Sequence, residues 1–400
     1  MEMTVGPELN LPANEATTKS KVAASTSDLF FLDALRGIAA LVVMVGHARW
    51  LLWEGYSEGY SKHPEQYNFV EKILVYFFAA FKYGHQSVLF FFVLSGFVIH
   101  LKYSKSLQKN PAAKFNFGSY LYRRVKRIYP PFLFILLVTY LLDYFGTKFG
   151  YSIYSGQTPN TLLNNNISLN HSWTNLVGNL LFWRGSTVDI WGTNTPLWSL
   201  KYEWWFYMIY PLLFGVNKKS VLISGIVVVS IFIASLFVSF PAAISFIQSV
   251  LQYLLFWWFG ALLADIYTKR STLSYSYLSA FIIILPLMAV FGERWVSNTM
   301  LSDGIWALGF FGLLNFFFFL QQKGFRLHFM KRLKWLGDCS YTLYIIHFPI
   351  LVFINGMILH ANGNQMPKSF IYVLLIIPFI IFISYIIHFI VEKPFTTTRK

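Results

Sequence analysis

The stretch FLDALRGIAALVVMVGHARWLL, residues 31–52, is apolar enough and long enough to cross a bilayer as one helix. It nevertheless carries Asp33, Arg36 and His47. Arg36 and His47 are eleven positions apart, which places them about 20° apart around the axis of an α-helix. Because ionisable groups are costly in hydrocarbon, this shared face predicts a functional site within a membrane helix.

The composition indicates an all-α, polytopic integral membrane helix bundle, with the lipid bilayer as its surroundings. Hydrophobic residues make up 56% of the 400 residues and charged residues only 12%. The net charge of +15 comes from basic residues in short loops between apolar runs, which is typical of membrane topology and not of a nucleic-acid partner. The single cysteine, Cys339, excludes an intrachain disulfide. The histidines lack the spacing of metal ligands, so no metal is expected.

We expect about ten transmembrane helices in one membrane domain, residues 30–395. Residues 1–29 are polar and without periodicity, which predicts a disordered cytoplasmic tail and not a cleaved signal peptide, and residues 396–400 form a short cytoplasmic tail. The apolar stretch Val70 to Phe81 is predicted to lie at the membrane interface or to re-enter. The predicted spans are Phe31 to Leu52, His85 to Leu101, Ile128 to Phe145, Leu197 to Phe214, Val221 to Phe240, Val250 to Tyr267, Tyr275 to Phe291, Asp303 to Leu320, Tyr341 to Leu359 and Ser369 to Ile390.

The orientation follows from the basic residues of the short loops. The segment between the second and third spans has no acidic residue and carries Lys102, Lys105, Lys109, Lys114, Arg123, Arg124, Lys126 and Arg127. This segment is therefore predicted to be cytoplasmic, and an even number of spans puts both termini on that side. The loop from about Gly146 to Thr195 is rich in Asn, Ser, Thr and aromatic residues. It then lies outside and is a candidate binding lid.

A carboxylate partner for His47 is predicted on the fourth span. At 1.5 Å per residue, His47 lies about 7 Å and Glu203 about 9 Å below the outer surface, so the two can meet if their helices are neighbours. A paired carboxylate orients an imidazole and makes it basic enough to take a proton from an alcohol. Two alternatives stay open, in which His47 only satisfies a neighbouring carbonyl, or Glu203 belongs to an interfacial aromatic belt with Trp198, Tyr202, Trp204 and Trp205.

Arg124 and Arg127 lie at i and i+3 on one face of a short helix that Pro130 would end. Two forked guanidinium groups suit a phosphorylated ligand. The positive-inside rule explains the same charges, and from spacing alone it is the favoured explanation. Three further ionisable residues within spans, each expected singly to be a hydrogen-bonded core group, are Asp265, His347 and His388.

Five segments carry a recognisable pattern in a fixed order. They are Leu32 to Ala40 followed by His47, Phe90 to Ile99, Arg124 and Arg127 followed by Ile128-Tyr129-Pro130, Leu197 to Tyr207, and Ser340 to His347. Together they resemble the acyltransferase 3 family of bacterial membrane O-acyltransferases over about residues 31–395. Members often have a glycine and a valine before the phenylalanines of the second helix, whereas this chain has Gly84-His85-Gln86-Ser87-Val88, which leaves the role of His85 open.

The resemblance implies transfer of an acyl group, usually acetyl, from an acyl-CoA on the cytoplasmic side to a carbohydrate hydroxyl on the outer side. Acetyl-CoA or another acyl-CoA is expected as co-substrate, with no bound cofactor. The implied catalytic residues are His47, as general base or transient acyl carrier, and Glu203, which would orient it. The implied donor-binding residues are Arg36, Arg124 and Arg127, and the supporting residues are Asp33, Ser95, Trp198 and Tyr202.

The acceptor is expected to be a cell-surface or lipid-linked glycan, and the membrane domain or a separate outer-side transferase partner completes the transfer. Two other functions stay open. A proton-coupled transporter of a polar solute would use Arg36, His47 and Glu203 as a relay, although no repeat or paired helix break supports it. A non-enzymatic sensor would bind a glycan through the Gly146 to Thr195 loop. The favoured interpretation is an enzyme of the bacterial inner membrane.

Overall fold

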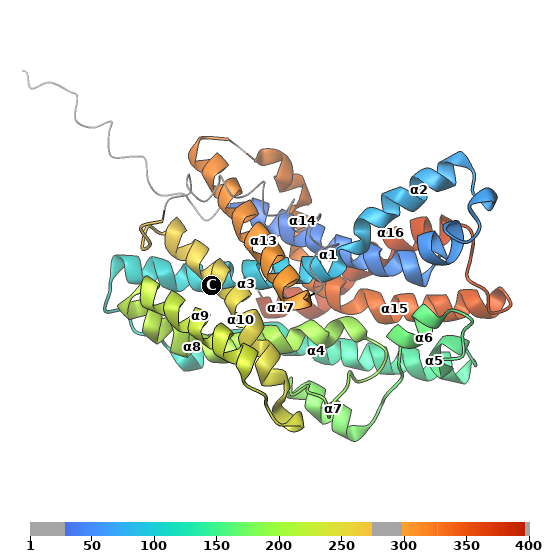
Figure 1. The fold of residues 1–400 in the computed structure, drawn as a ribbon, viewed down its shortest axis with the longest axis horizontal. Coiled ribbons are helices and arrows are strands. Elements are labelled where there is room, and N and C mark those ends of the chain that lie inside the picture. Colours follow the sequence, from blue (N-terminus) through green and yellow to red (C-terminus); the bar gives the residue numbers. More distant parts are fainter. Residues whose placement is uncertain (1–28, 274–297, 326, 397–400) are drawn as a thin grey trace, which may run out of the picture.

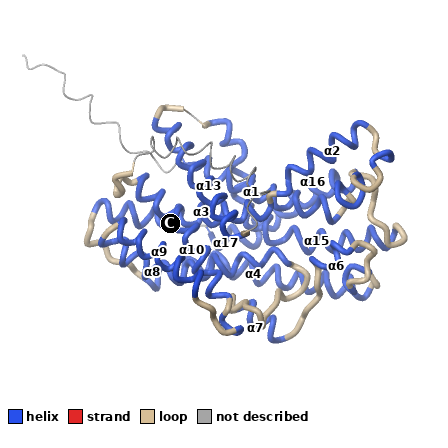
Figure 2. Tube along the Cα trace, in the orientation of Figure 1, coloured by secondary structure: helices blue, strands red, loops and turns tan. Residues whose placement is uncertain are grey.

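The computed structural model describes residues 29–273, 298–325 and 327–396, and within these ranges the chain consists of helices and loops without a strand (Figures 1 and 2). The predicted span Tyr275 to Phe291 and nearly all of the predicted tails lie outside them. The helices are α1 (Phe30–Leu51), α2 (Phe69–Ala79), α3 (Gly84–Lys109), α4 (Phe117–Lys148), α5 (Ser152–Ser155), α6 (Thr161–Asn166), α7 (Trp173–Leu180), α8 (Leu200–Lys219), α9 (Val221–Phe237), α10 (Phe246–Tyr267), α13 (Thr299–Gln322), α14 (Lys334–Asp338), α15 (Ser340–Ala361), α16 (Ile371–Ile387) and α17 (Lys393–Thr396).

The prediction of a polytopic membrane bundle is confirmed. Within the described residues, seven helical segments are long and apolar enough to cross a membrane, and they contain α1, α3, α4, α10, α13, α15 and α16. Two more of the ten predicted spans correspond to α8 and α9. Helix α9 has only 17 residues, so it is shorter than the seven. Helix α8 carries Lys201 and Glu203 near its start and two lysines in its last turn, so it is less apolar than the seven.

The prediction that Pro130 ends a short helix is wrong. Pro130 and Pro131 lie inside α4, which continues for 32 residues to Lys148. Buried side chains on both sides of the prolines, including Ile128 and Phe132, hold the helix where backbone hydrogen bonds are missing, as is tolerated in membrane helices. Arg124 and Arg127 therefore lie on the same continuous helix as the membrane-spanning part of α4.

Helix α1 lies in the middle of the bundle and contacts α3, α14, α15 and α16 (Figure 1). It approaches α14 closely at Gly37, where an added Cβ would stand 2.6 Å from the backbone nitrogen of Gly337. A Cβ on Gly337 would in turn stand 2.0 Å from the backbone oxygen of Asp33. Glycine at both positions lets the two backbones touch, and this contact fixes where the polar face of α1 points.

The segment before α8 runs inside the bundle. Thr193 and Asn194 are fully buried, and a short 3₁₀ helix, Thr195–Ser199, connects them to α8. The side-chain amide of Asn194 donates to the carbonyl of Ile345 on α15, at 2.9 Å. The end of the 146–195 loop is therefore anchored beside the second turn of α15.

We predict that Gly37→Ala destabilises the folded protein by about 1–3 kcal/mol, because the methyl group has no room between two backbones. The apparent melting temperature of the purified protein in detergent measures this loss. Gly215→Ala is the matched control, since a Cβ at this helical position meets no atom within 4 Å. Equal melting temperatures for the two variants would show that the contact between α1 and α14 is looser than described.

Candidate functional site

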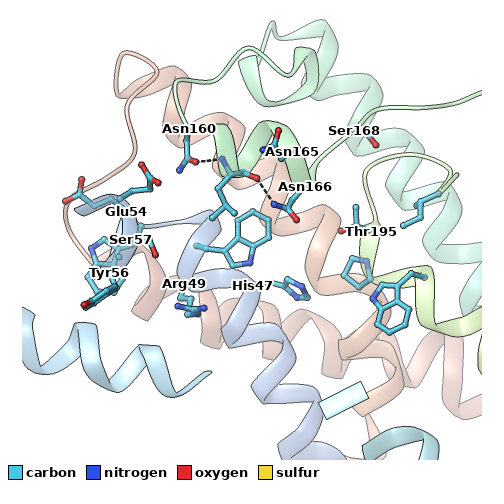
Figure 3. Close-up of a pocket in the computed structure, with 18 of the residues that line it drawn as sticks. His47, Arg49, Glu54, Tyr56, Ser57, Asn160, Asn165, Asn166, Ser168 and Thr195 are labelled. Carbon is cyan, nitrogen blue, oxygen red and sulfur yellow. Dashed lines mark hydrogen bonds between the residues drawn. The ribbon is translucent and has the colours of Figure 1, made fainter. Parts of the chain in front are cut away.

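A polar cavity of about 640 Å³ opens at the end of α1 that carries His47. Its wall combines residues of α1 and the following turn with residues of the 146–195 loop and the 3₁₀ helix. In Figure 3, His47 lies between Arg49 and Thr195, and Asn166 lies above it. We call this space the outer cavity, after its predicted side of the membrane. It is lined by His47, Arg49, Trp50, Trp53, Glu54, Gly55, Tyr56, Ser57, Glu58, Asn160, Leu162, Asn165, Asn166, Ser168, Arg184, Asp189, Ile190, Thr195, Pro196 and Trp198.

His47 is paired with a second histidine. Its Nδ1 lies 3.0 Å from Nε2 of His347 on α15, and the two rings stack with centroids 5.1 Å apart. His347 is fully buried, and its Nδ1 lies 2.9 Å from the carbonyl oxygen of Leu343. His347 is one of three residues that the sequence alone predicts to be ordinary core groups, and it is the direct partner of the predicted catalytic residue.

The hydrogen bonds of this pair determine where the protons are. A carbonyl oxygen only accepts, so Nδ1 of His347 carries its proton and Nε2 of the neutral ring is an acceptor. His47 must then donate from Nδ1, which leaves the lone pair on its own Nε2. This nitrogen is able to take a proton or to attack a carbonyl carbon.

The predicted pairing of His47 with Glu203 is wrong. Glu203 accepts a hydrogen bond from the hydroxyl of Tyr207, one turn along α8, and does not line the outer cavity. The depth estimate placed the outer surface at Leu197. The chain is already inside the bundle at this point, because Tyr344 of α15 donates to the carbonyl of Pro196 at 2.8 Å. Glu203 therefore lies further toward the opposite side than His47 does.

A second, narrower cavity of about 90 Å³ lies between α1, α3, α4, α8 and α15, and we call it the inner cavity. It brings together all three predicted donor-binding arginines, Arg36, Arg124 and Arg127, with Glu203 and Ser95. A third cavity of about 350 Å³, which we call the mouth, shares Arg36 and Arg127 with it. The remaining residues of the mouth are Trp335, Asp338, Tyr385, His388, Phe389, Glu392, Lys393 and Thr396.

The three arginines differ in how much of their hydrogen-bonding capacity is used. Arg36 donates to the carbonyl of Gly337 at 2.9 Å and to the hydroxyl of Ser340 at 3.0 Å, and it forms an ion pair with Asp33 at 3.0 Å. Much of the hydrogen-bonding capacity of its guanidinium group is therefore used to hold α1 against α14 and α15.

Arg124 and Arg127 are freer to bind a ligand. The guanidinium of Arg124 lies over the rings of Tyr120 and Tyr207, 5.6 and 5.3 Å from their centroids, and its buried Nε has no hydrogen-bond partner among the described residues. Arg127 lines both the inner cavity and the mouth. The partly unsatisfied guanidinium of Arg124 and the guanidinium of Arg127 line one low-dielectric space, and such a pair is well suited to phosphate oxygens.

Tyr344 separates the inner cavity from the histidine pair. It lines the inner cavity, its hydroxyl lies 2.8 Å from the hydroxyl of Ser199, and its ring centroid lies 6.1 Å from that of His347. Ser199 also lines the inner cavity, while the preceding Trp198 lines the outer one. Tyr344 and the end of the 3₁₀ helix thus form part of the partition between the two cavities.

A comparison with known protein families matches residues 29–389 to the acyltransferase domain model of the acyltransferase 3 family. The chain belongs to the acyltransferase 3 family. A stretch of 139 residues is 33% identical to the acyltransferase MdmB of Streptomyces mycarofaciens, and this alignment covers 34% of the chain and 30% of the relative. The chain thus aligns with about a third of the length of that relative. No solved structure gives a significant match.

Within this family member, the four predicted supporting residues lie around the two cavities. Asp33 holds Arg36, and Ser95 of the inner cavity accepts a hydrogen bond from the indole of Trp257 at 3.4 Å. Trp198 lines the outer cavity, and the ring of Tyr202 packs edge-on against the indole of Trp198. Sequence reasoning missed Tyr344, although it lies in the same segment as His347, because the segment alone does not show which helix it faces.

Proposed function

We propose that the protein is a membrane O-acyltransferase, an O-acetyltransferase in its simplest form, which moves an acyl group from acyl-CoA to a hydroxyl of a cell-surface or lipid-linked glycan. The observation that supports this most is the order of the site. Arginines suited to an anionic donor lie on one side of Tyr344, and His47 faces a polar cavity on the other side. Together with family membership, this order favours an enzyme that accepts its two substrates from opposite sides.

In this proposal the mouth and the inner cavity hold the donor. The phosphates of the coenzyme bind to Arg124 and Arg127, and the thin pantetheine arm passes through the inner cavity toward Tyr344. The protein lies in the bacterial inner membrane with both termini in the cytoplasm, so that the mouth faces the cytoplasmic pool of acyl-CoA. Glu203 does not orient His47 here. It is the carboxylate of the inner cavity and offsets part of the positive charge of the arginines.

The chemical step uses the free nitrogen of His47. Nε2 takes the proton of the acceptor hydroxyl, and the oxygen forms a bond to the thioester carbonyl carbon as the carbon–sulfur bond breaks. The leaving thiolate then receives the proton from the imidazolium, which gives the ester product and free coenzyme A. His347 keeps Nδ1 of His47 engaged throughout, and so maintains the orientation of the ring.

The function is tested by comparing surface polysaccharide from cells with and without the protein by mass spectrometry. We expect the mass of an acyl group on the glycan only where the wild-type protein is present, and none with His47→Ala at equal membrane insertion. Membranes given acetyl-labelled acetyl-CoA without acceptor test the acyl-carrier route, since label bound to the protein would show an acyl-histidine. Acceptor-dependent proton flux in liposomes without acyl donor would point to a transporter instead.

We predict that the double variant Arg124→Ala, Arg127→Ala raises the KM for acetyl-CoA by at least about tenfold, because charge-assisted hydrogen bonds to phosphate are lost. The matched control is Arg123→Ala, Lys126→Ala, which removes two charges from the same helix outside the inner cavity. If both double variants change KM equally, the basic run serves only the topology of the protein.

We predict that His347→Phe lowers kcat by at least about tenfold, because a ring of similar size fills the space but no longer accepts the hydrogen bond that orients His47. His360→Phe, at the exposed end of the same helix, is the control. A kcat close to the wild-type value in His347→Phe would exclude the histidine pair from the mechanism.

A further inference from the structure

His85, which no part of the proposed mechanism uses, belongs to a closed set of contacts at the start of α3. Its Nε2 lies 3.0 Å from both carboxylate oxygens of Asp303 on α13. The same carboxylate accepts a hydrogen bond from the hydroxyl of Tyr253 on α10 at 2.7 Å. Asp303 is buried, whereas the side chain of His85 is 43% exposed. The buried carboxylate thus holds a partly exposed imidazole in a fixed plane.

The contacts continue through aromatic rings back to His85. Its imidazole stacks on the indole of Trp198 with centroids 5.6 Å apart and the planes inclined by 16°. Trp198 packs edge-on against Tyr202 at 5.7 Å, and Tyr202 packs against Tyr253 at 4.9 Å. We call these five residues, His85, Trp198, Tyr202, Tyr253 and Asp303, the Trp198 brace. It links α3, α8, α10, α13 and the 3₁₀ helix, and its effect is to fix the plane of one tryptophan.

Trp198 is also part of the wall of the outer cavity that contains His47. It is only partly buried. We propose that Trp198 is the platform on which a sugar ring of the acceptor stacks, and that His85 and Asp303 are positioning residues that hold this platform. The inference rests on the proposed function and names the place of the acceptor within it.

The chemistry of the cavity favours a sugar as the stacked group. One face of a pyranose ring presents C–H groups, which pack against an aromatic plane, while its hydroxyls point outward and need hydrogen-bond partners. The same cavity offers the side chains of Asn165, Asn166 and Thr195, whose amide and hydroxyl groups both donate and accept. A platform with a fixed plane determines which hydroxyl reaches His47, and so it contributes to the choice of the acylated position.

The primary test compares Trp198→Ala and Trp198→Phe with wild-type protein in proteoliposomes. The donor is acetyl-CoA, and the acceptor probe is the surface polysaccharide purified from cells that lack the protein. We expect Trp198→Ala to raise the KM for the polysaccharide by about tenfold with the KM for acetyl-CoA unchanged, and Trp198→Phe to restore most of the loss. Trp173→Ala, which removes a tryptophan that is 79% exposed and outside the outer cavity, is the control.

A second test addresses the brace without changing the platform. His85→Ala removes both the stacked ring and the hydrogen bond to Asp303, and we expect the KM for the polysaccharide to rise while kcat changes little. His85→Phe keeps a flat ring against Trp198 and is expected to lie closer to wild type than His85→Ala. A merely structural role would instead lower the amount of folded protein and leave the KM of the remaining enzyme unchanged.

The outcomes separate this inference from the proposed function. If the wild-type protein transfers no acyl group to the polysaccharide, the proposed function fails. If the wild type is active but Trp198→Ala leaves the KM for the polysaccharide unchanged, the proposed role of Trp198 is overturned and the proposed function stands. A rise in the KM for acetyl-CoA in Trp198→Ala would also overturn it, because it would place Trp198 on the donor path.

Discussion

The polar face of α1 and its attachment to one neighbouring segment determine the arrangement of the site. Arg36 donates to Gly337 and Ser340, and His47, three helical turns further along, contacts His347. All three partners lie between residues 337 and 347, so α1 is tied at two levels to the same stretch of α14 and α15. In a bilayer each such group must find its partner inside the protein. The hydrogen bonds of Arg36 and His47 therefore fix both the rotation and the depth of α1.

Around this axis the site divides into compartments of different chemistry. Arg36 and Arg127 are common to the mouth and the inner cavity, Tyr344 closes the inner cavity on the far side, and His47 lies beyond Tyr344 at the outer cavity. A membrane protein that bound only one substrate would not need a mouth, an inner cavity and an outer cavity in sequence. The two polar substrates proposed here, which arrive from opposite sides, do need separate compartments, because water passing freely between them would hydrolyse an activated acyl group.

Much of this arrangement could be predicted from residues close together in the sequence. The shared face of Arg36 and His47 follows from helical periodicity, and the pairing of Arg124 with Arg127 follows from their spacing. The error over Glu203 has a specific cause. Its depth was counted from Leu197, but the hydrogen bonds of Asn194 and Pro196 to α15 show that the chain enters the bundle earlier. Such contacts join residues about 150 positions apart, and helical periodicity contains no information about them.

The nature of the partner of His47 has a consequence for the chemistry. Other histidines of the described chain contact carboxylates, namely His85 with Asp303, His100 with Asp265, His171 with Asp143 and His388 with Glu392. His47 instead contacts a neutral ring, which orients it but supplies no negative charge to stabilise an imidazolium. In the proposed mechanism, a proton taken from the acceptor therefore passes on at once to the leaving group, because the thiolate of the donor is the base that is formed at that moment. In that mechanism the pairing of two histidines thus favours proton removal only when an acyl donor is in place to release its thiolate.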